Sequence, residues 1–323
     1  MSFRFSHLKR LGNRLQITMP TDPDGFLGRE CPNADCLGYF KIKLGTGLTG
    51  EDLPCHCPYC GHTAPHDNFW TSEQIEYAKS IALRKMTEAI QRDLKQLEFS
   101  HPPRGPLGIG ISLKVKPGVP VPIRYYREKL LETSITCDQC GLQFAIYGLF
   151  AFCPDCRDHN SLQILDKNLD LTLKELGMAE ASESTELSRH LIEDALENCV
   201  SALDGFGRES CRIRAKLASD SSKATRMSFQ NLDGANERLK EAFGIDLKSA
   251  VALTDWNAAF RAFHKRHVVA HRSGIADGQY IKETGDTSVL PGRIIPLDPL
   301  EVRAAISSVR SLGHTLTSLL PPP

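Results

Sequence analysis

Histidines and basic residues gather in one short stretch of the chain, residues 261–272. It contains three histidines, three arginines and one lysine, and no acidic residue lies between Asp255 and Asp277. Imidazole titrates near neutral pH and can transfer a proton in either direction. A guanidinium binds a phosphate through two parallel hydrogen bonds. The stretch therefore carries groups for proton transfer at a phosphate.

The same stretch is expected to end a helix. Thr254 and Asp255 are capping residues, and apolar residues follow them at helical spacing. The pair Ser273-Gly274 can end the helix, because glycine readily takes the left-handed conformation. Along such a helix His267 and His271 share a face, whereas Arg266 and His271 point about 140° apart.

One pattern in this stretch resembles the motif of the HEPN superfamily of ribonucleases and RNA-binding toxins. It consists of an arginine, a polar residue directly after it, and a histidine five positions after the arginine. Arg266, His267 and His271 match this motif, and the resemblance covers roughly residues 184–323. It implies an all-α HEPN-like helical bundle and metal-independent cleavage of an RNA substrate. It also implies a homodimer in which two motifs face each other, in a toxin or anti-phage defence effector with a trigger or antitoxin partner.

Such a reaction assigns a role to each residue of the motif. Cleaving RNA without a metal needs a base for the 2′-hydroxyl proton, an acid for the leaving oxygen and a cation for the developing charge. His271 would transfer the proton, Arg266 would hold the phosphate, and His267 would position the phosphate or His271. A dimer partner would relieve the wide angle between Arg266 and His271.

Two other interpretations of this stretch remain open. His264, His267 and His271 fall at i, i+3 and i+7 on one helical face, which is compatible with a zinc or iron triad. The stretch has no glutamate to act as a base, unlike the helical His-Glu-x2-His hydrolases. Alternatively, the basic face is solvated or paired with acids, and the protein is a non-catalytic adaptor that binds nucleic acid or protein.

Cysteines form the second group with a chemical signature. Eight of the eleven cysteines stand in closely spaced pairs with a hairpin or apolar run between them, the layout of a zinc ribbon. Cys55 is left over and could replace Cys57 only in a distorted knuckle, and Cys199 and Cys211 are expected to be buried apolar residues. We predict two structural zinc ions, one bound by Cys31, Cys36, Cys57 and Cys60 and the other by Cys137, Cys140, Cys153 and Cys156.

The sequence around these groups predicts the elements that position them. We expect an α+β multidomain protein with two small β zinc ribbons, a connecting helix and the helical bundle. Thr71 and Gln74 form a capping box that starts the helix. Strands are expected over 109–116 and 119–126, a loop over 217–230, and a hairpin between 279–283 and 292–297. The predicted segments are zinc ribbon 1 over 1–70, the connecting helix over 71–100, a β segment with zinc ribbon 2 over 101–165, a linker over 166–183 and the helical domain over 184–323.

Charge and hydropathy limit the classes of partner. The formal net charge is zero, so nucleic acid would have to bind to local patches. Residues 124–127, Arg-Tyr-Tyr-Arg, could follow a nucleic-acid strand by charge and stacking, or form a solvated strand edge. No apolar run approaches the roughly 20 residues that span a bilayer, and the N-terminus has no apolar signal region. We therefore expect a cytoplasmic protein without a membrane partner.

Overall fold

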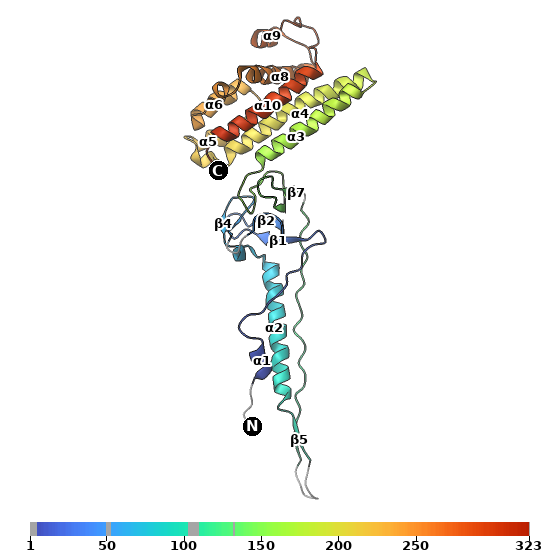
Figure 1. The fold of residues 1–323 in the computed structure, drawn as a ribbon, viewed down its shortest axis with the longest axis vertical. Coiled ribbons are helices and arrows are strands. Elements are labelled where there is room, and N and C mark those ends of the chain that lie inside the picture. Colours follow the sequence, from blue (N-terminus) through green and yellow to red (C-terminus); the bar gives the residue numbers. More distant parts are fainter. Residues whose placement is uncertain (1–4, 50–52, 103–109, 132, 323) are drawn as a thin grey trace. The chain divides into compact units, whose positions relative to one another are not determined.

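The computed structural model describes residues 5–49, 53–102, 110–131 and 133–322. The chain divides into two compact units, Met1–Asp158 and His159–Pro323. Figure 1 shows that the first unit combines small sheets with one long helix, whereas helices dominate the second. The expected α+β composition with a C-terminal helical region is confirmed. No helix among the described residues is both long and apolar enough to cross a membrane.

One antiparallel sheet joins the two cysteine-rich segments of the first unit. Its strand order is β1 (Phe26–Glu30), β2 (Tyr39–Lys43), β8 (Gln143–Ile146) and β7 (Thr133–Thr136). The central pairing places Lys41 opposite Ala145 and Ile42 opposite Phe144. The expectation of two separate ribbons in series is therefore wrong. Side chains of both hairpins, Phe40 and Phe144 among them, fill a single core, because a lone hairpin cannot cover its own apolar face.

A long insertion separates the two hairpins in the sequence. It begins with β3 (Cys55–His56), β4 (Thr63–Ala64) and the 3-10 turn His66–Phe69, and continues with α2 (Ser72–Lys95). The predicted capping box is confirmed, since the Thr71 hydroxyl accepts from the Gln74 N–H and the Gln74 side chain accepts from the Thr71 N–H. The N-terminal α1 (Ser6–Arg10) lies beside α2, where the N–H groups of His7 and Leu8 donate to the Asp93 carboxylate.

The predicted strands over 109–116 and 119–126 are mostly wrong. Residue 109 lies outside the described residues. Among those described in the two stretches, only β6 (Ile111–Leu113) forms, paired with β5 (Phe99–His101), and residues 114–131 contain no strand. Prolines 117, 120 and 122 cannot donate the hydrogen bonds of a sheet ladder. The segment instead follows α2, where the Arg124 N–H donates to Ser80 Oγ at 3.0 Å and the Tyr126 ring packs on Tyr77.

The second unit is a helical bundle around one core. Its long helices are α3 (Ser161–Ala181), α4 (Thr185–Arg212), α8 (Leu253–Arg272) and α10 (Pro299–Leu319). Phe206, Phe229 and Trp256 are among its fully buried residues. Shorter helices cover it: the 3-10 turn Ala215–Leu217, α5 (Ser221–Thr225), α6 (Leu232–Phe243) and α7 (Leu247–Ala250). Helix α9 (Gly278–Thr284) instead packs on α8, where Tyr280 and Val268 belong to a smaller, separate cluster.

Two parts of this unit differ from expectation. The predicted linker over 166–183 largely coincides with α3, which does not merely connect domains but buries Leu169 and Leu176 in the core of the unit, because these residues repeat at helical spacing. The predicted loop over 217–230 contains α5, which starts where the Asp220 side chain caps the N–H groups of Ser222 and Lys223. Residues before 166 also belong here, since α3 begins at Ser161.

The predicted hairpin after α8 is also wrong. Residues 279–283 lie in α9, whose N-cap Asp277 accepts from the Tyr280 N–H. The partner of the later segment is instead the turn that follows α8: Ile275 bridges to Ile294, and the Ile295 N–H donates to the Gly274 carbonyl at 2.8 Å. The aspartate cap therefore decides the conformation of a stretch whose apolar alternation suggested a strand.

Candidate functional site

The eight predicted metal ligands form two groups, each with its sulfur atoms within 4.8 Å of one another. In the first group Sγ–Sγ distances of 3.7 Å separate Cys31 from Cys60 and Cys36 from Cys57. In the second, Cys137 and Cys156 are 3.6 Å apart, and Cys140 and Cys153 are 3.5 Å apart. A disulfide needs about 2.05 Å. Tetrahedral zinc with bonds of about 2.3 Å would separate its sulfurs by about 3.8 Å. The residues present therefore fit a tetrahedral metal ion in each group.

All four cysteine pairs share one backbone conformation. The residue directly after the second cysteine has a positive φ in each case: Leu37 at 48°, Gly61 at 67°, Gly141 at 77° and Arg157 at 64°. Glycine takes this left-handed conformation at little cost, whereas a residue with a side chain pays about 1–2 kcal/mol. Two of the four turns are therefore strained, which indicates that the arrangement of the sulfurs is imposed by the rest of the unit.

Backbone hydrogen bonds link the two cysteine groups. The His56 N–H donates to the Pro154 carbonyl at 2.8 Å, and the Phe152 N–H donates to the Pro58 carbonyl at 2.8 Å. Pro58 lies between Cys57 and Cys60, and Pro154 lies between Cys153 and Cys156. Each cysteine loop is thus bonded to a segment of the other group. The sequence could not show this link, because about one hundred residues separate the two loops.

The three remaining cysteines lie outside both groups. Cys55 is buried in β3, and burial raises the pKa of its thiol to about 12. Cys199 and Cys211 are fully buried in α4, where burial likewise raises the pKa of each thiol to about 12. The expectation that the last two are buried is confirmed.

Helix α8 carries the histidine motif and ends where its sequence predicts. Ser273 and Gly274 both have positive φ, 52° and 75°, and the Gly274 N–H donates to the Val268 carbonyl at 3.1 Å. The helix buries Trp256 and Phe263 on one side. His267 and His271 lie on the exposed side, with ring centroids 4.9 Å apart. The structure therefore brings these two predicted site residues together.

Arg266 lies apart from the two imidazoles. Its guanidinium donates to Glu197 on α4 through Nε at 2.7 Å and through Nη2 at 2.5 Å, and 15% of the side chain is exposed. This bidentate pair neutralises the charge and ties α8 to α4. The three motif residues do not converge on one point within a single chain. Glu197 is not predictable from the sequence, because nothing in the spacing of α4 identifies it as a partner of α8.

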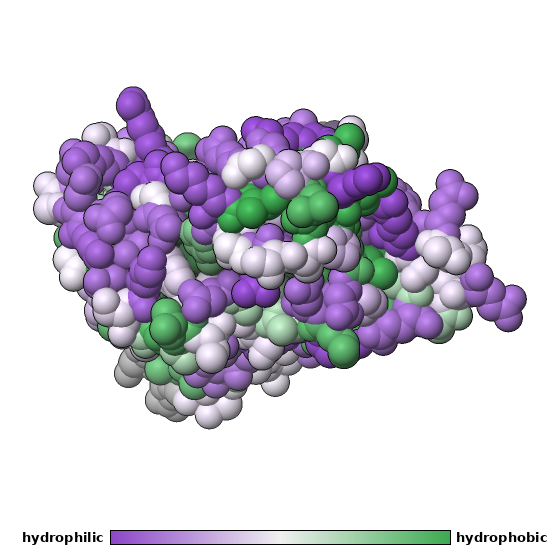
Figure 2. Space-filling view, turned by 90° about the horizontal axis from the view of Figure 1, so that it is seen from above, coloured by the Kyte–Doolittle hydropathy of each residue, from purple (hydrophilic) through white to green (hydrophobic). Residues whose placement is uncertain are grey.

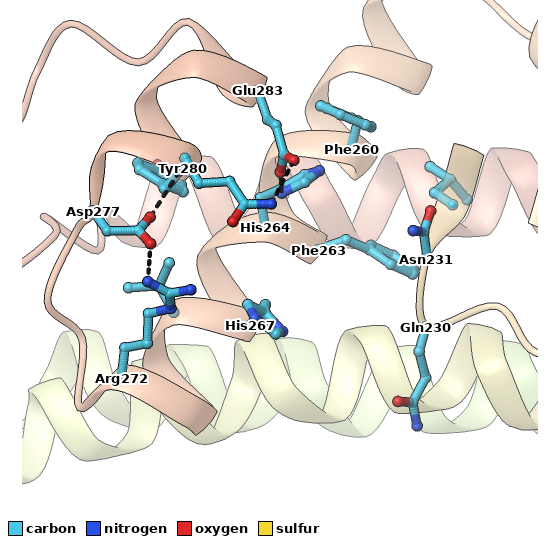
Figure 3. Close-up of a pocket in the computed structure, with 13 residues that line it drawn as sticks. Gln230, Asn231, Phe260, Phe263, His264, His267, Arg272, Asp277, Tyr280 and Glu283 are labelled. Carbon is cyan, nitrogen blue, oxygen red and sulfur yellow. Dashed lines mark hydrogen bonds and ion pairs between the residues drawn. The ribbon is translucent and has the colours of Figure 1, made fainter. Parts of the chain in front are cut away.

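A cavity of about 240 Å³ lies beside His267, between α8, α9 and the start of α6 (Figure 3). The His264 ring packs against Phe260, with centroids 4.4 Å apart, and its Nδ1 lies 3.2 Å from Glu283 Oε2. Burial lowers the pKa of His264, opposed by the charge of Glu283. Arg272 forms an ion pair with Asp277 at one end of the cavity.

The alternative metal site does not form. Across the described parts of the chain, the groups that could hold a metal ion are the two cysteine groups, and His264, His267 and His271 are not among them. His264 is turned toward Glu283, whereas His267 contacts His271. The separation follows from the side chains at the helix surface: Phe260 and Glu283 hold the first ring away from the other two.

The basic and aromatic run at 124–127 is partly compensated. Arg124 pairs with Glu76 at 2.7 Å, while 77% of Tyr125 is exposed beside the Tyr77 ring. The run is neither a sheet edge nor an uncompensated patch. Its role in binding nucleic acid stays a prediction.

Comparison with known proteins identified no relative of this chain. None of the protein-family models, curated proteins or solved structures compared with the chain matches it.

Proposed function

We propose that this protein is a metal-independent endoribonuclease of the HEPN type, with its active site on the exposed side of α8. The observation that carries the proposal is the pair of exposed imidazoles, His267 and His271, whose ring centroids are 4.9 Å apart and of which His267 lines a cavity. Two adjacent imidazoles can supply both proton transfers of a phosphodiester cleavage at neutral pH. The motif resemblance to HEPN ribonucleases points to the same residues.

The reaction is a transesterification within the RNA chain. One imidazole, assigned to His271, takes the proton from a 2′-hydroxyl as its oxygen attacks the adjacent phosphorus. The bond from phosphorus to the 5′-oxygen of the next nucleotide breaks, and that oxygen receives a proton from His267. The products are a 2′,3′-cyclic phosphate and a 5′-hydroxyl. The reaction needs no oxidant, reductant or metal.

Arg266 acts as a positioning residue in this proposal. Two of its three guanidinium nitrogens donate to Glu197, so Arg266 fixes the axial position and the rotation of α8 relative to α4. Arg272 lines the same cavity as His267 with 41% of its side chain exposed, and is therefore the cation assigned to the phosphate. Its pairing with Asp277 would have to loosen when substrate binds.

A homodimer through the C-terminal unit completes the site. Ile275, Leu290 and Ile294 follow α8 in the chain and are 45%, 72% and 56% exposed. Figure 2 views this end of the molecule, where hydrophobic side chains lie among a mostly hydrophilic surface. Exposed apolar residues on the segment that follows the histidines in the chain would let a second copy dock and bring its own motif opposite the first. The role as toxin or anti-phage effector follows from the resemblance alone, and the role of the cysteine-rich unit in sensing a trigger or selecting the RNA follows from the architecture.

Zinc is the proposed metal in both cysteine groups. Four thiolates at tetrahedral spacing suit zinc, and a site closed by four protein ligands leaves no position for substrate. Zinc would stabilise the fold of the first unit and take no part in cleavage. Activity should therefore persist when accessible divalent ions are chelated for minutes.

The test compares one RNA oligonucleotide with its 2′-O-methyl counterpart, with and without brief treatment with EDTA. We expect the RNA to be cut equally with and without the chelator, and the 2′-O-methyl strand to remain intact, because it has no 2′-hydroxyl to attack. Cutting of the 2′-O-methyl strand, or immediate loss of activity in EDTA, contradicts the proposal. Binding of RNA without cleavage favours the alternative function, a non-catalytic adaptor.

A further inference from the structure

The cavity beside His267 has one aromatic wall and polar groups at its edges. Phe260 on α8 is half-buried and contributes an accessible ring, while Phe263 behind it is 4% exposed. Figure 3 shows Gln230 and Asn231 at one end, Arg272 and Asp277 at the other, and Glu283 between them. A cavity of about 240 Å³ is smaller than the roughly 300–1,000 Å³ of sites for drug-sized ligands. It fits one planar ring system.

Glu283 determines which hydrogen-bonding groups that ring system must carry. Its Oε1 accepts from Gln279 Nε2 at 3.0 Å, and its Oε2 lies 3.2 Å from His264 Nδ1. An ionised carboxylate offers about four acceptor positions, so these two contacts orient the group and leave capacity for a ligand. With 40% of its side chain exposed, Glu283 remains accessible. The cavity therefore presents a fixed acceptor beside an aromatic face.

We propose that this cavity binds a guanine base of the RNA next to the phosphate that is cut, and so selects the cleavage site. The inference rests on the proposed ribonuclease function. Proteins read single-stranded RNA by stacking bases on aromatic rings and bonding to their Watson–Crick edges. Guanine has two neighbouring donors on that edge, the ring N–H and the amino group, and both match one carboxylate. Adenine, cytosine and uracil place an acceptor beside their donor.

The position of His267 connects the cavity to the chemistry. His267 lines the cavity and also contacts the His271 ring at 4.9 Å between centroids. A base stacked on Phe260 would therefore place its own ribose and phosphate within reach of the histidine pair. Asn231 adds a directional group: its Oδ1 caps α6 by accepting from the Gly234 N–H at 2.8 Å, which fixes the amide at the cavity edge.

The test maps cleavage sites on an RNA pool of randomised sequence, using the full-length wild type, Glu283→Gln and the control Glu237→Gln. Glu237 is an exposed acid of α6 that does not line the cavity. We expect wild type and control to cut beside guanine at least about tenfold more often than beside other bases. Glu283→Gln keeps the size of the side chain but replaces an acceptor with a donor, so the preference should fall about tenfold.

Binding of mononucleotides separates this inference from the function on which it rests. Calorimetry with guanosine, adenosine, cytidine and uridine monophosphates needs no cleavage. Selective binding of the guanosine nucleotide, weakened in Glu283→Gln, supports the guanine site even if no RNA is cut. Cleavage without a base preference, a preference unchanged in Glu283→Gln, or equal binding of all four nucleotides overturns it, and cleavage in those cases leaves the ribonuclease proposal standing.

Discussion

Replacing Cys57 with serine is expected to remove metal from both cysteine groups. The two groups share one sheet and one core, and the loop after Cys57 bonds to the Phe152 N–H beside the second group. A structural zinc site contributes on the order of 10 kcal/mol to folding, which is comparable to the whole stability of a typical domain, about 5–15 kcal/mol. Loss of one ion should therefore unfold the shared sheet and release the other.

The measurement is the zinc content per chain after gel filtration, with circular dichroism of the same sample. We expect two ions per wild-type chain and none in Cys57→Ser. Cys55→Ala is the matched control, since Cys55 lies two positions away, is equally buried and belongs to neither group. It should keep both ions. One ion retained in Cys57→Ser would show that the sites are independent, and loss of zinc in Cys55→Ala would contradict the ligand assignment.

Alanine at His271 or at His267 is expected to lower the rate of RNA cleavage by about 10²–10⁴-fold, the usual contribution of one general acid or base. Both imidazoles are exposed, so their removal should leave the thermal melting temperature almost unchanged. His190→Ala is the control, because His190 is a well-exposed histidine of α4 that does not line the cavity beside His267. It should keep full activity. Cleavage at the wild-type rate in His267→Ala and His271→Ala would rule out the site on α8.

Arg266→Ala should behave differently from the two histidine variants. It removes a largely buried bidentate pair with Glu197, so it should lower the melting temperature as well as the cleavage rate. Glu197 is 42% exposed and can be solvated once its partner is gone, which limits the loss of stability to about 1–3 kcal/mol. A variant that loses activity with unchanged stability would assign Arg266 to direct contact with the phosphate.

Local patterns in the sequence predict much of what positions these sites. Spacing of the cysteines identified all eight members of the two groups, because each pair is a single turn of the chain. The Thr71–Gln74 capping box and the Ser273-Gly274 helix end are also formed by neighbours in sequence. Such features depend on residues within a few positions of one another, and hydrogen-bonding geometry alone decides them.

Long-range pairing explains what the sequence did not predict. The contact of β2 with β8 joins segments on either side of the α2 insertion, and no periodicity in either strand indicates its partner. Arg266 and Glu197 meet only because α8 packs on α4. Asp277 shows a third cause: a single capping side chain starts α9 within a stretch whose alternation of apolar residues predicts a strand.

The chemical ends of the cut RNA test the central claim most directly. Mass spectrometry of the fragments, made by wild-type protein in EDTA, distinguishes attack by the 2′-hydroxyl from attack by water. The histidine pair predicts fragments ending in a 2′,3′-cyclic phosphate and beginning with a 5′-hydroxyl. Fragments with a 3′-hydroxyl and a 5′-phosphate would show hydrolysis by activated water, and they would contradict transesterification at His267 and His271.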